Sequence, residues 1–122
     1  MFLCYLAPKC EVNFRSIVPK PIEYIYGPRS VAIGDFNNDA WLDMVVANSL
    51  VNLIAVYFWN RNDTFSEPVK YTTGSYSTPY MVVVGHVNDD SQLDIVVANF
   101  GTNNVGIFLG FNNGSFANQI QL

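Results

Sequence analysis

Acidic and amide side chains are concentrated in one short segment of the chain, DFNNDAWLD at residues 35–43. Positions 1, 3, 5 and 9 of the segment carry side-chain oxygens, on Asp35, Asn37, Asp39 and Asp43. A hard cation such as Ca²⁺ takes roughly six to eight oxygen ligands, and carboxylates this dense repel one another unless a cation lies among them. With the backbone carbonyl of Trp41 at position 7 and with water, the segment predicts a calcium site.

Two other interpretations of this segment differ in what they require. An EF-hand needs a bidentate glutamate at position 12, but Val46 stands there, and strand-forming rather than helix-forming sequences flank the loop. A simple Asp- and Asn-rich turn needs only that the side chains accept hydrogen bonds from backbone N–H groups, which these residues do well. We favour the calcium site over the turn.

A second segment, HVNDDSQLD at residues 86–94, has the same spacing with one exchange. The expected ligands of this weaker second site are Asn88, Asp90, Asp94 and the backbone carbonyl of Gln92. His86 replaces the first aspartate, and imidazole is a poor calcium ligand. Asp89 adds a carboxylate, but its side chain should point away from the others. We expect His86 to be a turn residue without a catalytic role.

The two segments belong to an internal repeat of 51 residues that runs without a gap. The aligned pairs include Pro28 with Pro79, Gly34 with Gly85, Asp39 with Asp90, Asp43 with Asp94, Asn52 with Asn103 and Phe65 with Phe116. We therefore divide the chain into the end of a preceding unit with its linker (1–27), a first repeat (28–78) and a second repeat truncated at its end (79–122). A period near 50 is typical of propeller blades and of some helical repeats.

The elements that carry the two segments are predicted to be strands. Each repeat contains four apolar runs between turn-forming residues, at 31–34, 44–48, 53–59 and 65–71 and at 81–85, 95–99, 105–109 and 115–122. A single helix over 44–59 is the rival, but valine, isoleucine and aromatic residues dominate, and FGTNN in the second repeat favours a turn. We predict an all-β chain with two consecutive four-stranded antiparallel blades of a β-propeller.

The succession of a DxNxDxxxD loop, LD, VVAN, a polar turn, an apolar strand and then NRNDTF or NGSF resembles the FG-GAP or VCBS repeat. The resemblance implies a propeller similar to the integrin α-subunit head, usually seven-bladed, with Ca²⁺ in loops at one rim. Two blades cannot close a propeller, because their outer sheet faces and edges stay open, so we expect further repeats of the same propeller, or self-assembly, as partners. The family's glycine at loop position 6 is Ala40 in one loop and Ser91 in the other, where a left-handed backbone would be strained.

Composition excludes several classes of function. Half of the 122 residues are apolar and only 13% are charged, so much of the surface is expected to face protein rather than water. The net charge is −4 and the basic residues form no run, which excludes a nucleic-acid footprint.

The uncharged stretch 44–60 is broken by Asn48, Ser49 and Asn52, so we expect no membrane span. The opening MFLCYLAP is no convincing signal peptide. Cys4 and Cys10 could form a local disulfide or stay as free thiols.

No nucleophile elbow, phosphate-binding glycine loop, zinc spacing or acid–base pair is found in the sequence. We therefore expect a non-enzymatic, extracellular or cell-surface calcium-binding module for protein or glycan binding in adhesion. The alternatives are a propeller appendage of a secreted lipase-like or polysaccharide-lyase-like enzyme, and a lectin using Trp41, the one large aromatic expected to be exposed. Asn62 and Asn113 head N-x-[ST] sequons, which fit either glycosylation or tight turns.

Overall fold

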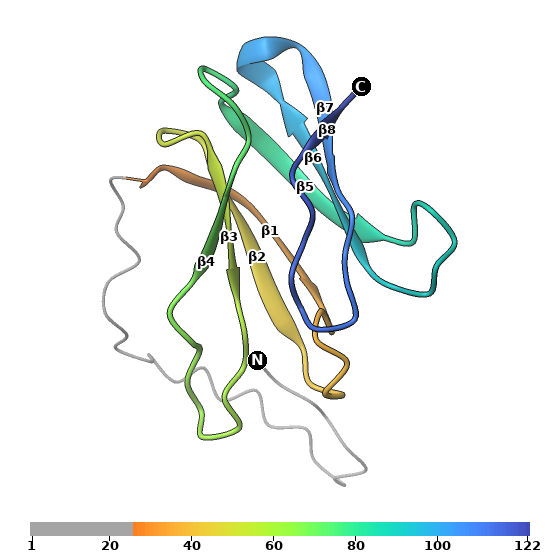
Figure 1. Ribbon diagram of the computed structural model, residues 1–122. Helices are drawn as coiled ribbons and strands as arrows, with labels where there is room; N and C mark the ends of the chain where they lie inside the picture. Colours follow the sequence, from red (N-terminus) through yellow and green to blue (C-terminus); the bar gives the residue numbers. More distant parts are fainter. Residues whose placement is uncertain (1–25) are drawn as a thin grey trace, which may run out of the picture.

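The computed structural model describes residues 26–122 and contains two four-stranded antiparallel sheets packed face to face (Figure 1). The first sheet has the order β1-β2-β3-β4 and the second β5-β6-β7-β8, so every strand pairs with its neighbour in sequence. The strands are β1 (Pro28–Gly34), β2 (Asp43–Asn48), β3 (Leu53–Tyr57), β4 (Val69–Thr72), β5 (Pro79–Gly85), β6 (Asp94–Asn99), β7 (Asn104–Phe108) and β8 (Ile120–Gln121). The prediction of an all-β chain with two four-stranded blades is confirmed, and the sheets do not close on each other.

The third strand of the first sheet and the fourth strand of each sheet have ends that differ from those predicted. β3 ends at Tyr57 rather than at residue 59, because the Trp59 N–H donates to the carboxylate of Asp43. Trp59 then meets Phe65 only in an isolated bridge, and β4 begins four residues later. The predicted strand 115–122 is reduced to β8 in the same way, after an isolated Gly110–Phe116 bridge. The predicted FGTNN turn contains a short 3₁₀ helix, η2 (Phe100–Thr102).

The hydrophobic core lies between the two sheets. We call the side of the first sheet that packs on the second its forward face, and the opposing side of the second sheet its backward face. The forward face contributes Ala32, Val45, Ala47, Ile54 and Val56, and the backward face contributes Val82, Val84, Ile95, Val97 and Phe108. Tyr71 and Phe116 pack edge to face at 5.7 Å, so the outer part of the interface is aromatic.

The linker between the sheets is fastened to both of them by hydrogen bonds. On the first sheet, Asn52 Oδ1 accepts the Thr78 N–H at 2.9 Å, and Asn52 O accepts the Thr73 N–H at 2.9 Å. On the second sheet, the Phe100 N–H donates to Thr78 O, as the Ser49 N–H donates to Gly27 O one repeat earlier. The 51-residue repeat of the sequence is therefore also a repeat of hydrogen bonds.

Each sheet has a second apolar face that the other sheet does not cover. In β1, Val31 is 57% exposed and Ile33 50%, and in β5, Met81 is 53% exposed and Val83 50%. These residues alternate along their strands with those that face the core. Residues 1–25 of the predicted end of a preceding unit, with Cys4 and Cys10, lie outside the described residues. Within 26–122 no helix has the length and apolar character needed to cross a membrane.

Candidate metal site

Three carboxylates of the loop between β1 and β2 converge on one point. Asp35 directly follows β1, Asp43 is the first residue of β2, and Asp39 lies midway between them. One oxygen from each of these side chains lies within 4.8 Å of the others. The spacing in the sequence predicted this convergence, because a short loop between paired strands must fold back on itself.

Backbone N–H groups hold the loop in its curled form. The two carboxylate oxygens of Asp35 accept the N–H groups of Asp39 at 3.1 Å and Ala40 at 2.9 Å. Asp39 Oδ1 accepts the Trp41 N–H at 2.9 Å, and Asn37 Oδ1 accepts the Asp39 N–H at 3.3 Å. The favoured calcium interpretation and the simple turn thus describe the same loop, since the side chains that converge also accept backbone hydrogen bonds.

The backbone of the loop is left-handed at two residues that carry a Cβ. Asn38 has φ 57° and Ala40 has φ 68°, and the equivalent residues of the second loop, Asp89 and Ser91, have φ 63° and 65°. Asparagine and aspartate tolerate this conformation, whereas alanine and serine adopt it at a cost. The strain expected at Ala40 and Ser91 is therefore present.

Asp43 differs from the other two carboxylates because it is buried. Its Oδ2 accepts the Phe36 N–H at 3.0 Å and its Oδ1 accepts the Trp59 N–H at 3.0 Å, so it clamps the start of the loop to the segment after β3. Burial is the main cause that raises the pKa of Asp43 above its usual 3.8, against the two backbone hydrogen bonds, and the charges of Asp39 and Asp35 raise it further.

The donor set fits a hard divalent cation. Carboxylate oxygens are the ligands that calcium prefers, and each of these oxygens has a lone pair beyond the one used by a backbone N–H. A cation among them would also offset the two effects that raise the pKa of Asp43, burial without a counter-charge and repulsion by its neighbours.

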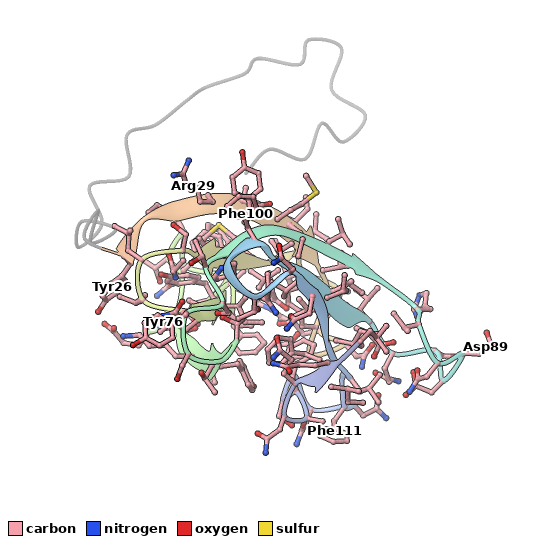
Figure 2. The ribbon with its side chains drawn as sticks, turned by 90° about the horizontal axis from the view of Figure 1, so that it is seen from above. Tyr26, Arg29, Tyr76, Asp89, Phe100 and Phe111 are labelled. Atoms are coloured by element: carbon pink, nitrogen blue, oxygen red, sulfur yellow. The ribbon has the colours of Figure 1, made fainter. Side chains whose placement is uncertain are left out.

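The second loop has no such convergence, although all of it lies in the described part of the chain. No three of its acidic and histidine side chains come together as those of the first loop do. His86 Nδ1 lies 2.8 Å from the carbonyl of Gln92, and must be the protonated nitrogen because a carbonyl only accepts. Asn88 donates to Asp90 at 3.1 Å. Asp89 lies at the outer end of the loop (Figure 2).

Asp94 repeats the clamp of Asp43 without the neighbouring carboxylates. It is buried, its Oδ2 accepts the Val87 N–H at 2.8 Å and its Oδ1 accepts the Gly110 N–H at 2.9 Å. The aspartate at position 9 of both loops was predicted as a metal ligand, and in both it has a structural role that needs no metal. In each repeat two backbone N–H groups at the junction of loop and strand, one buried and one partly buried, donate to this aspartate.

Two residues near the acidic loop were not singled out from the sequence. Asn38 Nδ2 donates across the sheet interface to Asn112 Oδ1 at 2.9 Å and to Gln92 Oε1 at 3.1 Å. The Arg61 guanidinium lies 5.7 Å from the centre of the Trp41 ring. Both contacts depend on how separate loops meet at one end of the sheets, and no local pattern signals them.

The prediction that Trp41 alone among the large aromatics is exposed is wrong. Trp41 is 37% exposed, but Tyr76 is 83% exposed in the linker between the sheets, and Tyr80 is also exposed. Tyr80 lies on β5 beside the Arg29 guanidinium and the Phe100 ring, at the edge of the molecule where Figure 2 labels Arg29 and Phe100. Trp59, by contrast, packs on Phe65 as expected of a structural aromatic.

Comparison with known proteins identifies the repeat. A search of curated proteins and a search of solved structures each found no match. The sequence model described as FG-GAP-like repeat matches residues 35–97, just over half of the chain, from the start of the first acidic loop through the second loop and into β6. Repeats of this family are in general non-catalytic modules. The chain belongs to the FG-GAP-like repeat family.

Proposed function

We propose that this chain is a calcium-binding β-propeller module whose loop at residues 35–43 holds Ca²⁺, and that it serves extracellular protein or glycan binding in adhesion. The convergence of Asp35, Asp39 and Asp43 within 4.8 Å carries the proposal. These three side chains, with Asn37 and the backbone carbonyl of Trp41, would hold the ion. No catalytic role is assigned to any residue.

Calcium in this loop would stabilise the structure around it. The loop starts at the end of β1, ends in β2, and meets the second sheet through Asn38. An ion that binds only the folded chain therefore stabilises two strands and one rim of the sheet interface together. The extracellular location rests on the usual setting of FG-GAP repeats, and extracellular calcium modules bind with dissociation constants of about 0.1 to 1 mM.

The proposal is tested by calcium-dependent unfolding. With a dissociation constant on the order of 0.1 to 1 mM, 10 mM Ca²⁺ stabilises the folded chain by about 1.4 to 2.7 kcal/mol, observed as a rise in Tm over EDTA. Asp39→Ala should abolish most of this rise. Asp90→Ala, at the equivalent position of the second loop, is the matched control and should retain it.

Two results would contradict the proposal. The parent chain could show the same Tm in 10 mM Ca²⁺ and in EDTA, or the rise in Tm could survive in Asp39→Ala. Mg²⁺ at the same concentration separates a calcium site from general screening of acidic groups, because Mg²⁺ demands a smaller octahedral shell that keeps several waters.

A further inference from the structure

The two uncovered sheet faces are repeat copies of the two faces that already pack together inside the chain. The forward face of the first sheet corresponds, 51 residues later, to the uncovered face of the second sheet. The aligned pairs are Ala32 with Val83, Val45 with Val96, Ala47 with Ala98, Ile54 with Val105 and Val56 with Ile107. Every member is apolar, and the largest difference in size is at Ala32, where Val83 has two additional methyl groups.

The other side of the interface is copied as well. The backward face of the second sheet corresponds, 51 residues earlier, to the uncovered face of the first sheet. Here the pairs are Val82 with Val31, Val84 with Ile33, Ile95 with Met44, Val97 with Val46 and Phe108 with Tyr57. Val46 is already buried, so the exposed part of this face of the first sheet is the strip along β1 formed by Val31 and Ile33, which we call the β1 strip.

We infer that copies of this chain associate head to tail, with the β1 strip of one copy packing on the β5–β6 face of the next. Inside the chain β5 lies against both β1 and β2, and the side chains of Val82, which is buried, and Val84, which is partly buried, belong to this interface. The repeat places Val31 and Ile33 of a second copy in the same positions against Met81, Val83 and Ala98. The occupant is thus a second copy of this chain, whose β1 strip corresponds in the repeat to the β5 residues that pack inside the chain.

A polar contact of the internal interface also has its counterpart at the open face. Asn52 Oδ1 accepts the Thr78 N–H across the two sheets. One repeat later the same pair consists of Asn103, whose side chain has no hydrogen-bond partner in the described chain, and Gly27 of the next copy. Asn103 has φ 52° and Asn52 has φ 54°, so the two side chains start from the same backbone conformation.

The rim contact acquires opposite charges. Inside the chain, Asn38 Nδ2 donates to Asn112 across the interface. The residues one repeat after Asn38 and one repeat before Asn112 are Asp89 and Arg61. A second copy docked in the same way therefore brings the Asp89 carboxylate toward the Arg61 guanidinium. Asp89 is exposed and projects from its loop at the outer end of the second sheet, where it is accessible to such a partner (Figure 2).

Head-to-tail contact uses two different surfaces, which gives it a distinctive test by mixing. Val31→Asp blocks the β1 strip and Val83→Asp blocks the β5–β6 face, and both positions are half exposed, so the chain tolerates a charge there. Each variant alone should be monomeric in sedimentation velocity with EDTA present, with association weakened roughly a hundredfold or more. When the two variants are mixed, the intact β5–β6 face of Val31→Asp can pack on the intact β1 strip of Val83→Asp. They should form a one-to-one complex that grows no further, because the two surfaces left over are both blocked.

The outcomes separate the alternatives. The parent chain should form species larger than a monomer as its concentration rises between about 1 and 100 µM. A parent chain that is still monomeric at about 100 µM overturns the inference, and so does a mixture of the two variants that stays monomeric. A single variant that still dimerises also overturns it, because dimerisation would then use a symmetric contact. Ser75→Asp adds the same charge in the exposed linker and should assemble as the parent does. EDTA keeps the result independent of the calcium site.

A charge exchange tests the docking register. Asp89→Arg or Arg61→Asp alone should weaken association about two- to tenfold at low salt, because like charges then meet at the rim. The double variant should recover most of the parent's association. A double variant that associates as weakly as the single variants would show that Asp89 and Arg61 do not meet between copies, and would overturn this arrangement.

Discussion

Replacing Asp94 by alanine removes a buried carboxylate that joins three parts of the second sheet. Its Oδ2 accepts the N–H of Val87 in the loop after β5, and its Oδ1 accepts the N–H of Gly110 after β7. Asp94 itself begins β6. Alanine leaves both N–H groups without an acceptor, and the Gly110 N–H is buried. We expect the folded state to lose stability without losing its fold.

The magnitude follows from the two hydrogen bonds. A hydrogen bond to a charged acceptor contributes about 1.5 to 3 kcal/mol, so the pair contributes about 3 to 6 kcal/mol before other effects. Removing the carboxylate also removes the cost of keeping it out of water, which returns part of this free energy. The net loss in the free energy of unfolding is about 2 to 4 kcal/mol, a large share of the roughly 5 to 15 kcal/mol typical of a domain.

Urea unfolding in EDTA measures this loss, with the fluorescence of Trp41 and Trp59 as the signal. Protein concentration is held constant, because self-association would shift the midpoint. The midpoint should fall in Asp94→Ala while the dependence on urea stays unchanged. Asp90→Ala is the matched control, since Asp90 is exposed, and should stay within about 1 kcal/mol of the parent. An Asp94→Ala variant that also stays within about 1 kcal/mol would refute the clamp.

Four further outcomes are expected. In EDTA, Asp43→Ala should lower the free energy of unfolding by about 1 kcal/mol less than Asp94→Ala does, because it also relieves the repulsion within the acidic loop. In 10 mM Ca²⁺ it should lower this free energy by more than Asp94→Ala does, and urea midpoints measure both differences. Ala40→Gly should stabilise the chain by about 0.5 to 1 kcal/mol, since glycine adopts a left-handed backbone freely, and an unchanged Tm would contradict this. Gly110→Ala should cost about 2 kcal/mol or more, because a Cβ there would overlap the backbone oxygen of the residue before Asp94, whereas Gly85→Ala meets nothing and should cost under about 0.5 kcal/mol in the same unfolding assay. Burial first, and then the neighbouring charges, raise the pKa of Asp43, so its folded state binds a proton more tightly than its unfolded state: the stabilising contribution is full below pH 3.8 and is lost as the pH rises through the raised pKa, seen as a difference between the parent and Asp43→Asn in EDTA.

The blade architecture could be predicted from the sequence because the repeat is long and without gaps. Runs such as VVAN at 45–48 and 96–99 recur in the same register, and both lie at the centre of a sheet. Strand ends were predicted less well. Asp43 and Asp94 accept the N–H groups of Trp59 and Gly110, which would otherwise donate to the backbone of a neighbouring strand. Hydropathy does not show where a side chain replaces a strand as the acceptor.

The acidic loop shows what spacing can and cannot reveal. The convergence of Asp35, Asp39 and Asp43 follows from their positions in a short loop, so the sequence was sufficient. The bond between His86 and the Gln92 carbonyl was not predictable, because it depends on the rotamer of one side chain. The contact of Asn38 with Asn112 was also out of reach, since it depends on how two sheets dock across 74 positions of sequence.

The order of strands within each sheet also determines how the chain is expected to fold. Every strand pairs with the next one along the chain, so a blade closes only short loops as it forms, and such local pairing is fast. Docking the sheets is different, because it joins residues about fifty positions apart, as when the Ser30 hydroxyl oxygen accepts the Val82 N–H. During synthesis the first blade can thus be complete before the second blade has formed and covered its forward face. In that interval an apolar surface is open to other chains, and the rate of docking decides between folding and misassembly.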